Sequence, residues 1–524
     1  MELAEPARGP NGPCARAKED IPEGAHILNI SGAPAVAPAQ NTIQVDAGFH
    51  LAADNALWGS IHHSCDPNCA INFNTWTFYA ARPVECGEVL TYNRLTTEWE
   101  LAAPFRCACG AGDCSGRIAG FKHLPHSRQE ELALFSSPYL MHRLFELAPL
   151  KTRRSSGVHA LKPRSAVYVF IPYAFKDGRI ESFDYDIPSF RAEVRGWFDS
   201  LDLPWRWVPI THENLGRTIE RLRAFAEAGD IMVLNLCDGS DIDSSPGVSV
   251  VRALENAGIP FTGGSSHFYA ITTPKVMMKE ELVSKGVPTP PFAALRDPAK
   301  DVFRLESEVG FPALIKPEVS SGSNGISLNS LVSDASSAEA QISRLFLAEY
   351  GEFYRSSGVF AERFVEGPEF TVLVVGNHEQ PQKVRVYPPV ERLFHSALPP
   401  RERFLSHDRY WSEFKEESRP PEGEPFYRYA LAPASLGESL ADLARRAFFA
   451  LGGTGYARVD MRRDAATGEL FVLEVNSNCG LSGDRETSVG EILHLTGIPI
   501  HSLISEILQA AADRQKLLTR DEHG

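Results

Sequence analysis

Two short strand-like runs in the C-terminal part of the chain constrain its fold more than any other feature. The first run carries Arg458 and Asp460, and the second carries Glu474 and Asn476, each pair two residues apart. Residues two apart on a strand share a face, and the short connection between the runs predicts an antiparallel hairpin. Asp460, Glu474 and Asn476 then converge as oxygen ligands suited to Mg²⁺. An exposed, salt-bridged hairpin face is the alternative, but it leaves these oxygens facing one another without a counter-charge.

A second feature lies upstream, where an apolar run at residues 311–315 leads into Lys316 and then into a Ser/Gly-rich loop at 318–326. Such a loop can turn several backbone N–H groups toward one anion while the lysine supplies a positive charge. The residue order differs from that of a P-loop. A strand that ends in a turn with a surface lysine is the alternative, and the isolated motif favours it.

The balance of charges limits the classes of partner. The chain has 524 residues, with 52 Lys and Arg against 67 Asp and Glu, so its formal net charge is 52 − 67 = −15. Because nucleic-acid binding depends on neutralising phosphates, this balance argues against a nucleic-acid partner. No apolar run approaches the roughly 20 residues that cross a bilayer, and no export segment is visible. We therefore expect a cytoplasmic protein with no membrane partner.

The middle of the chain predicts an α/β architecture. Residues 166–171 form a continuous apolar run typical of a buried parallel strand, and residues 231–236 form another. Helical patterns at 215–228 and from 248 onward alternate with these runs, which predicts a doubly wound parallel sheet. A helical stretch at 126–147 precedes them.

Together these segments resemble a known family. Residues 166 to about 511 resemble an ATP-grasp enzyme of the D-alanine–D-alanine ligase branch. The six matching blocks, in family order, are Pro260-Phe261-Thr262-Gly263-Gly264, residues 273–288 (from Thr273-Pro274-Lys275 through Gly286-Val287-Pro288), Ile315-Lys316-Pro317 with its Ser/Gly loop, residues 362–371, Arg458-Val459-Asp460 and Glu474-Val475-Asn476.

The resemblance implies roles for the residues in these blocks. Its ATP-binding residues would be Lys275 and Lys316 at the phosphates, Ser321 and Ser323 in the loop above them, Glu362, Arg363, Phe364 and Val365 at the adenine hinge, and Glu369 at the ribose. Two Mg²⁺ ions would be held by Asp460, Glu474 and Asn476. Arg458 and the backbone near Gly480 would stabilise the oxyanion at the acyl centre.

The implied reaction is the ATP-dependent joining of a carboxylic acid to an amine. ATP converts the carboxylate to an acyl phosphate with release of ADP, and the amine of an amino acid or peptide then attacks. Enzymes of this branch are commonly dimers, so we expect a homodimer.

Two departures from the ligase pattern, and one long segment where the family has a lid, concern substrate choice. Asn478-Cys479-Gly480 stands where the family usually has a proline before the glycine. An acidic loop at residues 235–243 could bind a cationic or amino substrate at the C-terminal end of the parallel sheet, or it could be a solvated turn. The long segment at 387–433 is either a lid or a disordered insertion.

The front of the chain carries a cysteine cluster. Cys107, Cys109 and Cys114 all lie in one Gly-rich stretch of eight residues, 107–114. Three thiolates this close would repel one another unless a cation held them, so the spacing indicates Zn²⁺ with one further ligand. Unconnected reduced cysteines are the alternative, and spacing alone does not identify the fourth ligand.

Residues 9 to about 121 resemble a shortened SET domain with its post-SET zinc loop. The matching pieces are residues 17–24, His63-Ser64-Cys65-Asp66-Pro67-Asn68-Cys69, residues 87–92 and the Cys107–Cys114 loop. The resemblance implies that Cys65 is the fourth ligand of a structural Zn²⁺. His62 replaces the asparagine that contacts the methyl donor, and Asn93-Arg94 replaces the catalytic tyrosine. These departures favour a non-catalytic module that binds substrate or mediates assembly.

The predicted fold is therefore a multidomain α/β (α+β) protein with an ATP-grasp fold behind a small β-rich zinc domain. The expected segments are a SET-like zinc domain at 1–125, a helical linker at 126–165, a pre-ATP-grasp α/β domain at 166–265, a central ATP-grasp subdomain at 266–365, a C-terminal subdomain at 366–515 that contains the insertion at 387–433, and a tail at 516–524. We expect an ATP-dependent ligase that acts in specialised metabolism. The alternatives are a bifunctional methyltransferase–ligase and a non-catalytic nucleotide-binding protein.

Overall fold

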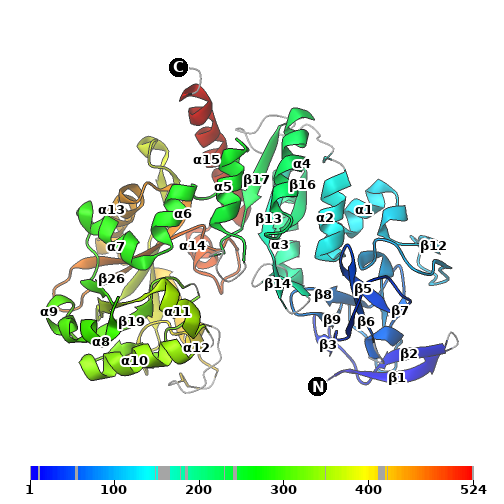
Figure 1. The fold of residues 1–524 in the computed structure, drawn as a ribbon, viewed down its shortest axis with the longest axis horizontal. Helices are drawn as coiled ribbons and strands as arrows, with labels where there is room; N and C mark the ends of the chain where they lie inside the picture. Colours follow the sequence, from blue (N-terminus) through cyan, green and yellow to red (C-terminus); the bar gives the residue numbers. More distant parts are fainter. Residues whose placement is uncertain are drawn as a thin grey trace. The chain divides into compact units, whose positions relative to one another are not determined.

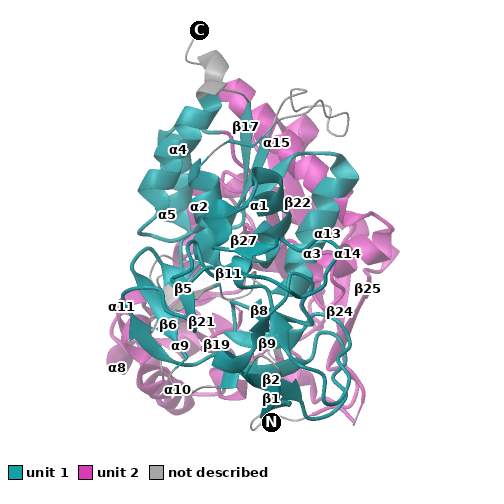
Figure 2. Ribbon diagram, turned by 90° about the vertical axis from the view of Figure 1, so that its right-hand side faces the viewer, with its two compact units in different colours: residues 1–259 teal, residues 260–524 magenta. Residues whose placement is uncertain are grey.

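The chain forms two compact units, residues 1–259 and residues 260–524 (Figure 1; Figure 2). The computed structural model describes residues 2–521 except 10–11, 54–56, 148, 151–165, 177–178, 183–186, 229, 240–244, 321, 349, 411–418 and 422. The predicted linker at 151–157 thus lies outside the described residues.

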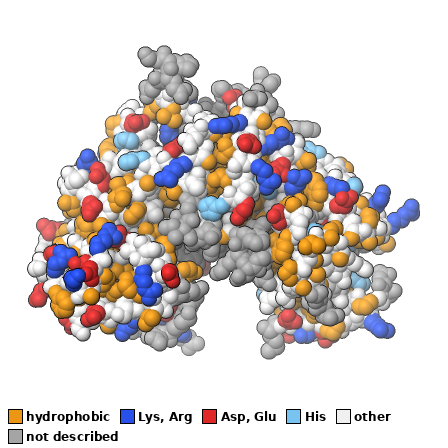
Figure 3. All heavy atoms as spheres, in the orientation of Figure 1, with side chains coloured by type: hydrophobic (Ala, Val, Ile, Leu, Met, Phe, Trp, Pro, Cys, Tyr) orange, Lys and Arg blue, Asp and Glu red, His pale blue; other side chains and the backbone are white. Residues whose placement is uncertain are grey.

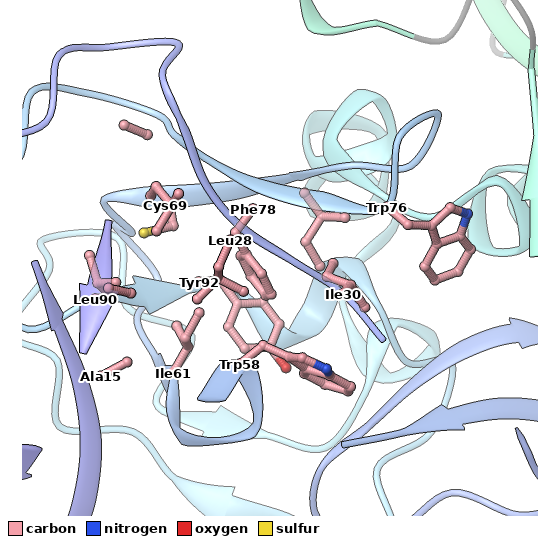
Figure 4. Packing of buried hydrophobic residues seen from close by; sticks show 14 of the residues in the cluster. Ala15, Leu28, Ile30, Trp58, Ile61, Cys69, Trp76, Phe78, Leu90 and Tyr92 are labelled. Carbon is pink, nitrogen blue, oxygen red and sulfur yellow. The ribbon is translucent and has the colours of Figure 1, made fainter. Parts of the chain in front are cut away.

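The first part of unit 1 is built from small antiparallel sheets around one apolar core. The strands are β1 (Ala4–Gly9), β2 (Gly12–Ala17), β3 (His26–Asn29), β4 (Ala33–Ala35), β5 (Thr42–Asp46), β6 (Phe49–Ala52), β7 (His62–His63), β8 (Cys69–Asn72), β9 (Thr77–Ala80), β10 (Thr91–Tyr92), β11 (Phe105–Arg106) and β12 (Arg117–Ile118). The strand orders are β3-β9-β8 and β4-β6-β5, and β7 pairs with β10 in parallel. Trp58, Phe78 and Tyr92 fill the core between them (Figure 4).

Two helices follow where the sequence predicts one helical stretch. Helix α1 (His126–Leu132) ends in a short 3₁₀ turn, and α2 (Pro138–Leu147) begins at a proline. Proline lacks a backbone N–H and suits the first turn of a helix, so Pro138 starts a new helix instead of continuing α1.

The third part of unit 1 is a parallel sheet, as predicted. Strands β13 (Ala166–Pro172), β16 (Trp205–Ile210) and β17 (Ile231–Asn235) pair in the order β16-β13-β17. Helices α3 (Pro188–Leu201), α4 (Leu215–Ala228) and α5 (Val248–Asn256) and a hairpin of β14 (Ala174–Lys176) and β15 (Arg179–Glu181) complete it. The sequence analysis missed β16, because Arg206 and Pro209 interrupt its apolar pattern. Arg206 is buried and forms an ion pair with Glu130 of α1.

Unit 2 contains two antiparallel sheets. The smaller sheet has the order β18-β21-β19-β20 and packs its apolar face against α10. Its strands and helices are β18 (Phe292–Ala294), β19 (Ala313–Pro317), β20 (Leu331–Val332), β21 (Val359–Arg363), α8 (Pro298–Asp301), α9 (Leu305–Glu308), α10 (Ala335–Leu347) and α11 (Gly351–Ser357).

The larger sheet has the order β25-β24-β22-β26-β27, with β23 paired to β22. Its strands are β22 (Glu369–Asn377), β23 (Arg385–Val386), β24 (Val390–Phe394), β25 (Tyr427–Leu431), β26 (Thr454–Arg463) and β27 (Leu470–Ser477). The remaining helices of the unit are α6 (Ser266–Thr272), α7 (Lys275–Ser284), α12 (His407–Tyr410), α13 (Ala434–Ala450), α14 (Ser488–Thr496) and α15 (Ile500–Asp521). Leu440, Ala444 and Phe448 recur on α13 at helical spacing and bury one face of this helix in the core of the sheet.

The insertion at 387–433 differs from the expectation of a lid or an unstructured segment in one respect. Its two ends are strands β24 and β25, which pair with each other from Val390↔Leu431 to Phe394↔Tyr427 and extend the larger sheet. Only the middle of the segment, between these strands, is a connection, and residues 411–418 of it are not described.

None of the described helices is both long enough and apolar enough to cross a bilayer. On the face shown in Figure 3, Lys and Arg side chains are interspersed with Asp and Glu side chains.

Candidate active site

Strands β26 and β27 form the predicted hairpin and bring the three oxygen-bearing residues together. Asp460 lies directly opposite Glu474, and Arg458 lies opposite Asn476. The amide nitrogen of Asn476 donates to Asp460 Oδ2 at 3.0 Å and to Glu474 Oε1 at 3.3 Å. Two carboxylates and one amide on a single sheet face are a donor set that fits Mg²⁺.

Asp460 is held in place from two sides. The Arg458 guanidinium donates to Oδ2 from Nε at 3.0 Å and from Nη2 at 2.9 Å, and the Thr371 hydroxyl donates to Oδ1 at 2.8 Å. Burial alone would lower the pKa of Arg458, but the Asp460 carboxylate outweighs it and raises that pKa. Arg458 therefore stays positively charged beside the carboxylates. Its side chain is held in place by its hydrogen bonds to Asp460.

Three lysines approach this hairpin from α7 and β19. Lys275 Nζ donates to the Ser320 carbonyl at 2.8 Å, and Lys316 Nζ lies 2.6 Å from Glu362 Oε1. The third is Lys279, whose ammonium contacts the other oxygen of Glu362. Burial lowers the pKa of Lys275 below its ordinary value, and the nearby Glu474 carboxylate offsets only part of this decrease. Sequence reasoning missed Lys279, although it follows Lys275 by four residues and so shares its helix face.

Glu362 is the centre of this charged cluster. Its carboxyl is buried, which by itself would raise its pKa, but Lys279 and Lys316 outweigh burial and bring the pKa down to about 2. The carboxylate that the resemblance places at the adenine hinge therefore contacts two ammonium groups. Its backbone pairs with Leu314 of β19.

The remaining hinge residues lie at the C-terminal end of β21 and directly after it. The backbone N–H of Arg363 donates to the Pro291 carbonyl, and that of Phe364 donates to the Pro312 carbonyl. The Phe364 ring packs edge-on against Phe404. Val365 is buried and its carbonyl accepts a hydrogen bond from Arg462 Nη1 at 3.0 Å.

Glu369, expected at the ribose, begins β22 and is buried between two arginines. Arg462 donates to Oε2 at 2.8 and 3.0 Å, and Arg392 of β24 donates to Oε1. Both oxygens thus have a charged partner within the protein. Arg392 also donates to the Tyr429 hydroxyl of β25 at 2.6 Å, so the insertion contributes directly to this carboxylate site.

The loop after β19 is compact in its described part. Ser323 and Gly325 have positive φ values of 58° and 77°. A Cβ on Gly325 would approach Pro317 Cγ to 2.7 Å, so this position needs glycine. Tyr354 of α11 donates its hydroxyl to Asn324 Oδ1 at 2.7 Å. Ser321 lies outside the described residues, as do residues 240–244 of the acidic loop.

The segment around Gly480 has one anchored and one open position. Asn478 has φ of 53°, is 2% exposed, and accepts the Gly264 N–H on Oδ1 at 2.7 Å. Gly480 has open space around its Cα, with no atom within 4 Å of an added Cβ. Asn478 thus fixes the turn, while the backbone at Gly480 remains accessible.

The four predicted zinc cysteines converge in unit 1. The sulfur atoms of Cys65, Cys107, Cys109 and Cys114 all lie within 4.8 Å of one another. The Cys65–Cys114 separation of 3.9 Å fits a tetrahedral site, whose edge is about 3.8 Å for Zn–S bonds of about 2.3 Å. Backbone N–H donation, first from Ala111, lowers the pKa of Cys109 to about 6, which favours a thiolate. The donor set therefore fits Zn²⁺.

Comparisons with known proteins agree with this architecture. The family model described as D-ala D-ala ligase C-terminus matches residues 282–509. The chain is 31% identical to a D-alanine–D-alanine ligase of Janthinobacterium sp. (strain Marseille) over 50% of this chain and 74% of that protein. It is 28% identical to a D-alanine–D-alanine ligase of Desulforudis audaxviator over 51% of this chain and 77% of that protein. Among solved structures, the D-alanine–D-alanine ligase from Bacillus anthracis complexed with ATP is similar with 21% identity and a TM-score of 0.46, over 68% of this chain and 99% of that chain.

These matches identify the protein as an ATP-dependent enzyme that forms carbon–nitrogen bonds, an ATP-grasp ligase. More narrowly, the chain belongs to the D-alanine–D-alanine ligase family. The match of the family model begins at residue 282, so the β-rich part of unit 1 lies outside it.

Proposed function

We propose that this enzyme joins a small carboxylic acid to an amine through an acyl phosphate, with release of ADP and phosphate. The observation that carries the proposal is the convergence of Lys275 and Lys316 with the carboxylates of Asp460 and Glu474 in unit 2. Cations that can bind triphosphate oxygens stand beside carboxylates that can hold a divalent metal, as phosphoryl transfer requires.

Each residue then has a defined task. Lys275, Lys316 and the loop with Ser321 and Ser323 bind the phosphates. The backbone at residues 362–365 binds adenine and Glu369 accepts the ribose hydroxyls. Asp460, Glu474 and Asn476 hold two Mg²⁺ ions, which neutralise charge on the phosphates when bound.

Arg458 acts in the second half of the reaction, in which it stabilises a negative charge on the acyl oxygen. When the amine attacks the acyl phosphate, the acyl oxygen becomes an anion. The guanidinium is already fixed by Asp460, so it needs no rearrangement to stabilise that charge, and the accessible Gly480 N–H can donate to the same oxygen. The leaving group is inorganic phosphate, and the amine loses its proton to complete the amide.

We propose amino acids or small peptides of specialised metabolism as substrates instead of the D-alanine pair of the cell wall. The support is the segment Asn478–Gly480, where the proline that usually precedes the glycine is replaced. Asn478 fixes this turn by accepting the Gly264 N–H at 2.7 Å.

We propose that the β-rich module of unit 1 binds a structural Zn²⁺ through Cys65, Cys107, Cys109 and Cys114 and does not transfer methyl groups. Tyr92, the tyrosine next to the expected catalytic position, is 2% exposed and packs edge-on against Phe78 at 5.3 Å (Figure 4). A phenol packed in the core cannot reach a substrate. Binding of S-adenosylmethionine in calorimetry would contradict this part of the proposal.

A product screen by mass spectrometry tests the ligase proposal. Purified protein is given ATP, Mg²⁺ and pools of amino acids and small carboxylates, with Lys316→Ala as the control. We expect ADP, phosphate and a new mass equal to acid plus amine minus water, absent in the control. Formation of AMP and pyrophosphate would reject the acyl phosphate, and ATP binding without any turnover would favour a nucleotide-binding protein.

A further inference from the structure

We propose that Lys279 is a positioning residue that keeps Lys316 available for the phosphates of ATP by sharing the Glu362 carboxylate. The inference rests on the proposed function, because it assumes that Lys316 is the phosphate ligand. It concerns a buried lysine to which the resemblance assigns no role.

The Lys279 ammonium is enclosed by partners within the protein. The side chain is 1% exposed, Nζ donates to the Thr289 hydroxyl at 2.8 Å and to the Leu473 carbonyl at 3.0 Å, and it forms an ion pair with Glu362. An ammonium has three N–H groups and no acceptor, and three partners surround this one, so it is not placed to bind a substrate. Lys279 therefore acts through its neighbours and not as a catalytic residue.

Glu362 divides its two oxygens between the lysines. Oε2 meets Lys279, whereas Oε1 lies 2.6 Å from Lys316 Nζ. The Lys316 side chain is 15% exposed and is the member of this group that a ligand can reach. Two cations and one anion leave one net positive charge, and the partly exposed Lys316 presents that charge.

The consequence of losing Lys279 follows from this charge count. Without it, Glu362 and Lys316 form a neutral pair in a poorly solvated site, where the attraction between opposite charges is strong. A phosphate oxygen would then have to compete with Glu362 for Lys316. If Glu362 is neutralised as well, Lys316 is released and the net charge returns to +1, so the second substitution should restore what the first removes.

Isothermal calorimetry with Mg-ATP and steady-state kinetics on four variants test this compensation. Lys279→Met should weaken ATP binding and raise KM for ATP by about tenfold, which corresponds to about 1.4 kcal/mol, while kcat at saturating ATP stays within about twofold. Lys279→Arg should largely retain wild-type KM. The double variant Lys279→Met/Glu362→Gln should bind ATP several-fold more tightly than Lys279→Met, because Lys316 is released from Glu362. Lys285→Met changes an exposed lysine directly after the C-terminus of α7; it is the matched control and should change nothing.

An unchanged KM in Lys279→Met, or a double variant that binds ATP more weakly than Lys279→Met, overturns the proposal. If Lys279→Met does not fold, the double variant decides, because it buries no unpaired charge: a loss of ATP affinity smaller than tenfold relative to the wild type supports the proposal, and a tenfold or larger loss overturns it. A wild-type protein that binds no ATP would instead contradict the proposed function itself.

Discussion

Asp460 and Glu474 face each other directly across the β26–β27 hairpin. Like charges in opposite positions on neighbouring strands are unfavourable. Asn476 donates to both of them, while Arg458 and Thr371 donate to Asp460. A metal cation bound between the two carboxylates during catalysis would offset this repulsion, which accounts for their opposed positions.

The first prediction concerns Glu474. In Glu474→Gln the repulsion across the hairpin is relieved, so the free energy of unfolding without metal should stay the same or rise by up to about 1 kcal/mol. Substrate-dependent ADP release should nevertheless be abolished, because one metal ligand is lost. Denaturant titration and a coupled ADP assay measure the two effects. Turnover at the wild-type rate would contradict the metal role.

The second prediction concerns Arg458. Arg458→Ala should lower kcat by roughly 10²–10³, because it removes a positioned donor at the developing oxyanion. Arg458→Lys keeps the charge but loses the two-point contact with Asp460, so it should fall between the wild type and the alanine variant. A loss confined to KM for ATP would assign Arg458 to nucleotide binding instead.

The third prediction concerns the buried cluster of Glu369 with Arg392 and Arg462. Glu369→Gln leaves two buried guanidinium groups without their anion, which should lower the free energy of unfolding by about 3–5 kcal/mol. Glu366→Gln changes an exposed glutamate three residues away and is the matched control. Equal stability of the two variants in urea titrations would contradict the ion pairs.

The fourth prediction concerns metal content. Elemental analysis of the purified protein should give about one zinc per chain, and Cys107→Ser should lose it. Cys86→Ser alters an exposed cysteine outside the cluster and should keep the zinc. Chelation should lower the melting temperature of the wild type but not that of Cys107→Ser. Full zinc content in Cys107→Ser would rule out this site.

The fifth prediction concerns pH. Burial lowers the pKa of His142 from 6.5 to about 4, and its imidazole lies 2.9 Å from the Thr218 hydroxyl. Between these values the unfolded chain binds a proton that the folded chain does not, so stability falls as the pH drops from 6.5 toward 4. The difference amounts to about 3 kcal/mol. The unfolding free energy of His142→Gln should therefore decline less between pH 7 and pH 5 than that of the wild type. Parallel declines would contradict the prediction.

The sequence was sufficient to predict the features that rest on local periodicity. The β26–β27 hairpin followed from two-residue spacing and a short turn, and the parallel strands β13 and β17 followed from unbroken apolar runs. Clustering of the four cysteines was expected from the spacing of three of them and from the SET-like resemblance for Cys65.

What the sequence did not reveal depends on partners far apart in the chain. Strand β16 contains Arg206, whose burial makes sense only with Glu130 of α1 beside it. Arg392 lies in a segment that the sequence left as either a lid or a disordered insertion, yet it forms an ion pair with Glu369. Lys279 is one of several lysines by sequence, and only the fold brings it to Glu362.

Helix α2 is shared by two parts of unit 1. Leu140 and Leu144 are buried in the apolar cluster that includes Cys65, while Phe145 packs edge-on against Tyr168 of β13 and Phe225 of α4. A chain shortened to begin at residue 166 would uncover Tyr168 and Phe225, and each apolar side chain of this size is stabilised by about 1.5–3 kcal/mol when buried. We therefore expect the ligase-like portion, which begins at residue 166, to be less stable when the residues before it are removed. Through α2, the front module is part of the packing that supports the parallel sheet of unit 1.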